Sequence, residues 1–308
     1  MALRIAIPDL VSPSYFPLIA AVELGFFKQQ GLEATIELVF PVTRTYEQLR
    51  DGRLDFVGGA AHAPLYAFSN WQGCKLLGAL AQRMYWFLVM DRRLGINRGD
   101  LSALKGLRIG AAPGPVDGLK RMLREVGIDP ERDVKLAPVP GSMGAGVSFG
   151  VAAAKALENG SIDGFWANGM GAEVAVRNGA GSLVIDARRE DGPAGAQHYT
   201  FPALVTTQRR IDTEPATVMA AVRALVGAQH ALKQDASRAT EVGARLFPPA
   251  ESELIAELIR RDAPYYDASI TPETVEHLNA FARDMGLLTR DVGYQQVVAT
   301  GCEALWRP

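Results

Sequence analysis

Apolar positions along the chain change repeatedly between two spacings, and the change predicts strands and helices in turn. Arg4–Ile7 is short and apolar, as a buried strand is, whereas Phe16–Phe27 places its apolar side chains at helical spacing and is followed by Gly31, a common stop residue. The β-branched stretch Thr35–Phe40 then predicts a second strand. Strands that alternate with helices favour parallel sheets covered by helices on both faces.

The same reading extends along the chain. Further strands are expected at residues 54–58, 76–80, 86–90, 107–111, 134–139, 162–166, 183–185 and 198–206, and helices lie between most of them, at residues 43–50, 63–70, 119–126, 151–157 and 173–177. After Thr213 the pattern becomes helical, with segments at residues 215–233, 237–246, 250–261 and 272–285.

Two short sequences occur twice. LRIAI at residues 3–7 returns as LRIGA at residues 107–111, and DGRLDF at residues 51–56 returns as NGSIDGF at residues 159–165. This period is too long for a solenoid repeat, so each copy is expected to form a small α/β lobe of its own. Two similar lobes imply a cleft between them, which is where proteins bind small molecules.

The change of pattern near residue 200 predicts that one lobe is inserted into the other. We expect lobe I to comprise residues 1–90 and 199–308, including the C-terminal helices, and lobe II to comprise residues 91–198. Two extended segments, residues 86–90 and 199–205, would connect the lobes and form a hinge.

Composition limits the classes of function. A chain of 308 residues allows two domains with separate cores, and a net charge of −2 without a basic run argues against nucleic acid and against an acidic membrane surface as partners. No apolar stretch approaches the roughly 20 residues that a membrane span needs. The histidines and the two cysteines, Cys74 and Cys302, show no metal-ligand spacing, so we expect no metal and no cofactor. Two buried free thiols are favoured over a disulfide.

The N-terminus bears on location. Leu3–Ile7 already reads as a core strand, and the pattern of a secretory signal is not seen before it. The protein is therefore expected in the periplasm if a signal segment has been removed, and in the cytoplasm if Met1 is the native start.

Taken together, these motifs resemble the type II solute-binding proteins of ABC importers, in the sulfonate, taurine and nitrate group that includes thiamine-pyrimidine-related binding proteins. The resemblance covers residues 3 to about 235, and its matching stretches are Pro17–Ala20, Gly25–Phe27, Gly31-Leu32, Leu49…Gly52…Asp55 with Ala63-Pro64, Leu101…Leu104–Gly110, Leu123…Gly127-Ile128, and Ala156-Leu157…Gly160…Asp163. It implies an α/β, two-lobe type II periplasmic-binding-protein fold, each lobe a mainly parallel sheet, joined by two hinge strands. It also implies a monomer that closes on a small-molecule ligand and docks on an ABC permease in the inner membrane.

Ligands of open α/β sheets meet the loops beyond the carboxyl ends of the strands. On that basis the candidate ligand-binding residues are Asp9, Tyr15, Arg44, His62, Trp86, Gly114, Asp117, Ser142, Met143, Trp166 and Asn168, with no catalytic residue among them. The loops themselves are expected at residues 9–15, 41–44, 59–62, 113–117, 141–145 and 166–168.

The chemistry of these residues departs from that of a sulfonate site. Asp117 places a carboxylate where an anion would bind, and Pro115 removes one backbone donor, although Arg44 could supply an anion contact. Aromatic side chains at three of the positions favour a planar aromatic or heteroaromatic ligand instead. Simpler readings stay open: Asp117 as a helix cap, Arg44 as a surface charge, His62 with a local hydrogen bond, and both tryptophans as core packing.

Other motifs give little support for a specific function. Gly146–Gly150 matches the G-x-S-x-G elbow of hydrolases but does not follow a strand, and the glycines at 141, 144 and 146 lack the Lys-Ser/Thr ending of a phosphate loop. The charged runs Arg188–Asp191 and Arg209-Arg210 read as solvated surface or permease-facing loops.

Three functions therefore remain: a binding protein that delivers its ligand to an importer; an enzyme on the same scaffold, such as a thiamine-pyrimidine synthase-like protein or a decarboxylase; and a ligand-sensing module. The missing signal favours the enzyme. The lack of a cysteine- and histidine-rich cluster argues against the synthase, and the lack of an attached signalling segment argues against the sensor.

Overall fold

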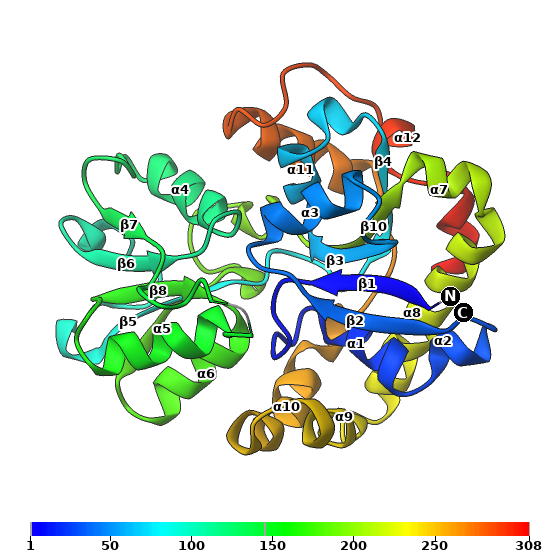
Figure 1. Ribbon diagram of the computed structural model, residues 1–308. Helices are drawn as coiled ribbons and strands as arrows, with labels where there is room; N and C mark the ends of the chain where they lie inside the picture. The colour runs from blue at the N-terminus through cyan, green and yellow to red at the C-terminus, as the bar shows by residue number, and fades with distance from the viewer. Residues whose placement is uncertain (1, 145, 308) are drawn as a thin grey trace. The chain divides into compact units, whose positions relative to one another are not determined.

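The computed structural model describes residues 2–144 and 146–307. Ala145, the last residue of one expected ligand loop, lies outside these ranges, as do the terminal residues of the predicted lobe I, Met1 and Pro308. Internal contacts group the described chain into a first unit, residues 2–82 and 201–307, and a second unit, residues 83–200. Figure 1 shows the elements of both units coloured along the chain.

The first unit contains a five-stranded sheet in the order β2-β1-β3-β10-β4. Its strands are β1 (Leu3–Ile7), β2 (Ala34–Leu38), β3 (Phe56–Ala60), β4 (Cys74–Ala79) and β10 (Pro202–Thr207). β1 pairs in parallel with β2 and β3, whereas β10 runs antiparallel between β3 and β4. Helices α1 (Phe16–Glu23) and α3 (Val42–Arg50) lie on opposite sides of these strands in Figure 1.

The second unit repeats this arrangement strand for strand. Its sheet has the order β7-β6-β8-β5-β9, with β5 (Phe87–Asp91), β6 (Arg108–Ala111), β7 (Lys135–Ala137), β8 (Gly164–Ala167) and β9 (Gly181–Asp186). Here β5 is the antiparallel strand, placed between β8 and β9 as β10 is placed between β3 and β4. Its helices are α4 (Val116–Glu125), α5 (Phe149–Glu158) and α6 (Gly169–Arg177). In each unit, four strands of the sheet thus run in one direction and a fifth runs antiparallel to them.

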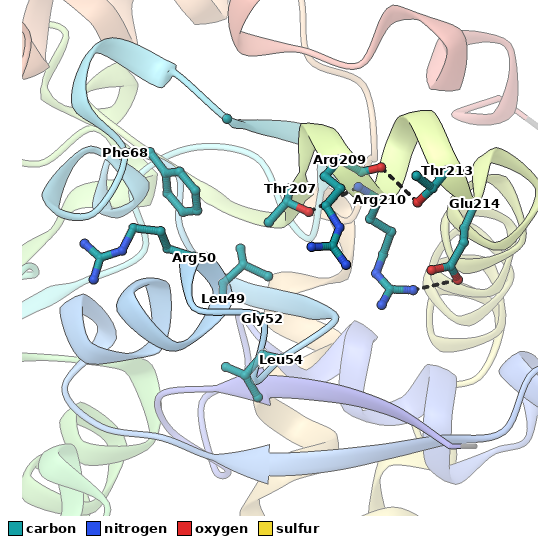
Figure 2. Close-up of a pocket in the computed structure, with 11 residues that line it drawn as sticks. Leu49, Arg50, Gly52, Leu54, Phe68, Thr207, Arg209, Arg210, Thr213 and Glu214 are labelled. Carbon is teal, nitrogen blue, oxygen red and sulfur yellow. Dashed lines mark hydrogen bonds and ion pairs between the residues drawn. The ribbon is translucent and has the colours of Figure 1, made fainter.

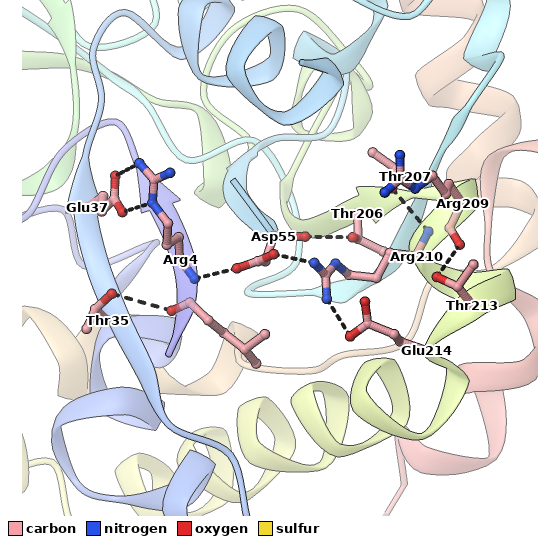
Figure 3. Close-up of polar contacts among 11 residues, drawn as sticks. Arg4, Thr35, Glu37, Asp55, Thr206, Thr207, Arg209, Arg210, Thr213 and Glu214 are labelled. Carbon is pink, nitrogen blue, oxygen red and sulfur yellow. Dashed lines mark hydrogen bonds and ion pairs between the residues drawn. The ribbon is translucent and has the colours of Figure 1, made fainter. Parts of the chain in front are cut away.

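A carboxylate stabilises the start of each first strand in the same way. The Oδ2 atom of Asp55 accepts the backbone N–H of Arg4 at 2.7 Å, and Oδ2 of Asp163 accepts that of Arg108 at 2.7 Å (Figure 3 shows the Asp55 contacts). In return the backbone N–H of each aspartate donates to the arginine carbonyl, at 2.9 Å and 2.8 Å. This reciprocal pairing explains why each copy of the LRI sequence, at residues 3–5 and 107–109, is matched by an aspartate, Asp55 or Asp163.

The glycine of the second repeated motif has a matching role in both units. Gly52 and Gly160 follow the ends of α3 and α5 and have φ values of +74° and +70°. Glycine adopts this left-handed conformation without a steric penalty, so it ends the helix and turns the chain towards the next strand.

The C-terminal part of the chain belongs wholly to the first unit. The long helix α8 (Pro215–Gln234) packs against α1 and α2 (Phe26–Gln29), and the remaining helices are α7 (Gln208–Thr213), α9 (Arg238–Leu246), α10 (Pro249–Asp262), α11 (Pro272–Asp284) and α12 (Tyr294–Val297). Segments after these helices cover the edge strand β4: the N–H of Ala299 donates to the carbonyl of Leu76, and the carbonyl of Ala268 accepts from Ala79. A covered edge cannot pair with another chain.

Two predicted helices differ from the structure. The helix expected from Phe16 to Phe27 is broken at Gly25, whose φ of +80° separates α1 from α2. The helix expected over residues 63–70 is only two 3₁₀ turns, η1 (Ala63–Tyr66) and η2 (Ser69–Trp71), because Asn70 and Trp71 both adopt positive φ. In the described part of the chain, no helix is both long and apolar enough to cross a bilayer.

We predict that stability depends on Asp163 in a pH-dependent manner. Hydrogen bonds from Arg108 hold the pKa of the Asp163 carboxyl below its usual range, so its contribution is present above about pH 4 and is lost as the pH falls through the lower folded-state pKa. Asp163→Asn should therefore lower the unfolding free energy by about 1–3 kcal/mol at pH 7, and by less at pH 3.

Denaturant unfolding at the two pH values measures both quantities. Glu276→Gln, at an exposed position on α11, is the control and should change stability by less than about 0.5 kcal/mol. An equal loss for the Asp163 variant at pH 7 and pH 3 would contradict the assignment.

Candidate functional site

In the first unit, the loop after β1 is held inward by its own polar groups and by a C-terminal tyrosine. Asp9 is buried, and its Oδ1 accepts the backbone N–H of Val11 at 3.1 Å. The hydroxyl of the buried Tyr266 donates to the carbonyl of Pro13 at 2.8 Å. Tyr15, also buried, is the last residue before α1. Distant segments of the first unit thus fix the loop that carries two of the predicted ligand contacts.

Ser12 in this loop has an unexpected environment. The sequence offers the hydroxyls of Ser12 and Ser14 as caps for the following helix, but the N-cap of α1 is Tyr15, and its side chain makes no capping hydrogen bond. Ser12 is fully buried, and its hydroxyl has no hydrogen-bond partner in the described residues. Buried hydroxyls are nearly always paired, so this one is a candidate to bind a ligand.

The loops after β2 and β3 bring further groups to this end of the first sheet. His62 is fully buried, and its ring packs edge to face on Phe281, with centroids 5.2 Å apart. Tyr46 on α3 lies near Tyr15, and burial holds the pKa of its phenol well above the usual value. Arg44 is placed in the first turn of α3 rather than in a free loop, and its side chain is exposed.

In the second unit, aromatic rings gather where β5 begins and β8 ends. The Trp86 ring lies 6.1 Å from that of Trp166 and 4.6 Å from that of Tyr85, measured between centroids. The indole Nε1 of Trp166 donates to the carbonyl of Pro115 at 2.8 Å. A Cβ on Gly118 would lie 2.8 Å from the Met84 sulfur and 3.5 Å from the Trp86 ring, so this glycine allows α4 to pack closely on the cluster.

Asp117 lies in the first turn of α4 and is buried. The N-cap of this helix is Pro115, so Asp117 is not the capping residue itself. Its carboxylate is at the positive end of the helix dipole, which stabilises a negative charge there. The preceding Gly114 has a φ of +89°, a conformation that lets the chain enter the helix from β6.

Among the other predicted residues in the second unit, two make local hydrogen bonds. The Ser142 hydroxyl donates to the carbonyl of Val139 at 2.7 Å, and Oδ1 of Asn168 accepts the N–H of Gly171 at 3.1 Å as the N-cap of α6. Met143 is exposed, with 41% of its surface accessible. These contacts show how Ser142 and Asn168 are held in place, and they leave their role towards a ligand as a prediction.

The hydrolase-like motif has a structural explanation. Ser148 follows a loop and is the N-cap of α5, which is not the strand-to-turn geometry that a nucleophile elbow needs. Gly150 lies where α5 meets α6: a Cβ on Gly171 would be 2.4 Å from the Gly150 carbonyl oxygen. The glycines serve close helix packing.

The structure also corrects the reading of the run Arg188–Asp191 as solvated charge. Arg188 is fully buried at the carboxyl end of β9, with its guanidinium 6.0 Å from the centroid of the Tyr85 ring. Asp186 is buried beside it and accepts a hydrogen bond from Arg189 at 2.7 Å. Sequence reasoning missed Arg188 because runs of charge are usually exposed, although its place directly after a strand is the signal used for the other candidates.

Comparison with known proteins identifies the family to which the chain belongs. The sequence matches the NMT1/THI5-like family over residues 12–238. The chain belongs to this family. No curated protein matches it in a sequence search.

Solved structures of several other proteins share the fold. The alkanesulfonate-binding protein SsuA from Xanthomonas axonopodis pv. citri, bound to MOPS, is 16% identical with a TM-score of 0.72, covering 98% of this chain and 97% of its own. The periplasmic nitrate-binding protein NrtA from Synechocystis PCC 6803 is 14% identical with a TM-score of 0.72, covering 99% and 87%. The desulfurization enzyme DSZB, as a mutant with biphenyl-2-sulfinic acid, is 17% identical with a TM-score of 0.66, covering 97% of each chain. The resemblance to type II solute-binding proteins and the two-lobe α/β fold are both confirmed.

Two buried serines, Ser12 and Ser142, provide a matched stability test. Ser12→Ala removes a hydroxyl without a partner, so the unfolding free energy should stay unchanged or rise by about 1 kcal/mol. Ser142→Ala removes a hydroxyl that donates to a carbonyl and should lower it by about 1 kcal/mol. Denaturant unfolding of the ligand-free protein compares them, and a loss for Ser12→Ala as large as for Ser142→Ala would reject the assignment.

Proposed function

We propose that this protein is the substrate-binding component of an ABC importer, which captures a small organic molecule with the carboxyl-end loops of both units and closes on it by hinge motion. The observation that carries the proposal is the duplicated sheet, in which both units bring polar and aromatic side chains to the same end of equivalent strands. Family membership and the shared fold with SsuA and NrtA support it. Delivery would be from the periplasm to a permease in the inner membrane, with the protein acting as a monomer.

The residues favour an aromatic or heteroaromatic ligand, including carboxylated rings and pyrimidines, over a simple sulfonate. Buried carboxylates at Asp9 and Asp117 disfavour a bare anion at the loops that carry them. The cluster around Trp86 offers faces and edges on which a planar ring can pack. We assign ligand contacts to Asp9, Tyr15, Arg44, His62, Trp86, Gly114, Asp117, Ser142, Met143, Trp166 and Asn168, and add Ser12 and Arg188.

The fold likeness to DSZB supports a second candidate, an enzyme on the same scaffold. The thiols of this chain give it little support. Cys74 and Cys302 are both free and buried, and burial raises the pKa of the Cys302 thiol to about 11 and that of Cys74 further. Neither thiol forms the nucleophilic thiolate readily near neutral pH, and Cys74 begins β4, at the end of that strand remote from the loops.

Native mass spectrometry of the purified protein tests the function. We expect a small molecule to co-purify, to be released on denaturation, and to keep its mass after prolonged incubation with fresh protein. Conversion of that molecule into a product of different mass would favour the enzyme, and failure of any compound in an aromatic and anionic library to raise the melting temperature would contradict a binding protein.

Two buried tryptophans allow a matched binding test with the compound so identified. Trp166 and Trp71 are both buried and both donate an indole hydrogen bond, but Trp71 lies in the turn before β4. Trp166→Leu should weaken binding about 5- to 150-fold, corresponding to about 1–3 kcal/mol of lost ring packing. Trp71→Leu should lose stability but keep its affinity. Calorimetric titration of folded variants measures this, and an unchanged affinity for Trp166→Leu would remove that residue from the site.

A further inference from the structure

A hollow of about 260 Å³ lies in the first unit, away from the carboxyl-end loops. It is lined where α3 ends, where β10 ends at Thr207, and by Gly73 just before β4 (Figure 2). These points are the amino ends of the parallel strands, so we call it the amino-end hollow. Its apolar lining comes from Leu49, Leu54 and Phe68.

Three arginines line the hollow, and they differ in how their charge is balanced. Arg210 forms ion pairs with Asp55 and with Glu214, the latter at 2.8 Å (Figure 3). Arg50 forms a hydrogen-bonded ion pair with Asp51 at 3.2 Å.

Arg209 is the exception. Its exposed guanidinium makes no ion pair or hydrogen bond with any residue in the ranges 2–144 and 146–307, and only its backbone carbonyl is engaged, by the Thr213 hydroxyl at 3.0 Å. Figure 2 shows its side chain turned towards Leu49, whereas Arg50 extends away. An unpaired guanidinium therefore lies beside an apolar surface, and it can bind an oxyanion through two parallel hydrogen bonds.

The second unit provides an internal comparison. A hollow occurs at the equivalent place, lined by Asp91, Arg92, Arg93 and Glu158 among others. Glu158 is the last residue of α5, as Arg50 is the last residue of α3. The lining of the second hollow thus holds two acids and two arginines, whereas that of the first holds three arginines and Glu214 alone. Both units form a hollow at this position, but only in the first unit does the lining hold more arginines than acids.

We propose that the amino-end hollow is a second binding site, which takes a small organic anion: a carboxylate or sulfonate carrying a compact apolar group. The oxyanion binds Arg209, and the apolar group packs on Leu49, Leu54 and Phe68. Arg210 is held in place by Asp55 and Glu214, which neutralise its charge, so the charge free to bind the anion is that of Arg209. The site is separate from the proposed ligand site, so it stands whether or not the protein serves an importer.

Nuclear magnetic resonance of the isotope-labelled full chain tests this, with benzoate and benzenesulfonate as probes and neutral benzamide as the uncharged control. Both anions should shift the backbone signals of Gly52, Gly73 and Thr207 in a saturable way that added salt weakens. Benzamide should not. The signals of Gly160 and Gly179, beside the hollow of the second unit, should stay in place, and any shifts at the carboxyl-end loops are read separately.

Substitutions then assign the charge. Arg209→Gln should weaken anion binding about tenfold or more, Arg209→Lys should retain part of it, and Arg92→Gln, the matched exposed arginine of the second unit, should leave it unchanged. Absence of anion-dependent shifts around the hollow in the wild type would overturn the proposal. So would shifts by benzamide equal to those by benzoate, or undiminished binding in Arg209→Gln.

Discussion

Each sheet depends on one antiparallel strand, which is not the neighbour in sequence of the two strands that it pairs with. β10 forms hydrogen bonds with both β3 and β4, and β5 does so with both β8 and β9. Without this strand, the last strand of each sheet would have no partner within it. Because β10 follows the whole second unit and yet completes the first sheet, the chain must cross between the units twice. The discontinuous first unit is therefore a consequence of how the sheets are completed.

The two ends of the sheets have different chemistry. At the carboxyl ends, acids, aromatic rings and Arg188 are buried, and the hydroxyl of Ser12 is left without a protein partner. At the amino ends, the repeated aspartates Asp55 and Asp163 pair with backbone and arginine, and these contacts hold the strands in register. Buried polar groups are usually paired, so a polar group left without a partner is available for a ligand. Among the described residues, the Ser12 hydroxyl at the carboxyl ends and the Arg209 guanidinium at the amino ends are such groups, and each supports one of the two proposed sites.

Much of the fold could be predicted because its signals are local. The repeated LRI and D segments mark equivalent strand starts, and Gly52 and Gly160 mark equivalent helix ends, so the duplication and the sequence of elements followed from spacing alone. The break at Gly25 and the positive φ of Asn70 and Trp71 could not be predicted, because they depend on packing and on distant hydrogen bonds: the carbonyl and side chain of Asn70 bind Gln296 and Thr289. The burial of Arg188 was missed because it lies in a run of charged residues, although its place after β9 is a local signal. The positions of candidate site residues followed from strand ends, but their burial and partners required the tertiary structure.

We propose that the protein acts as a clamp that closes on a small molecule. Small-angle X-ray scattering tests it most directly, with the radius of gyration measured for the protein freed of ligand and again at saturating concentration of the compound that co-purifies with it. A clamp should have a smaller radius of gyration with the compound bound and should recover the larger value after the compound is removed. The same radius with and without a compound shown to be bound would contradict it.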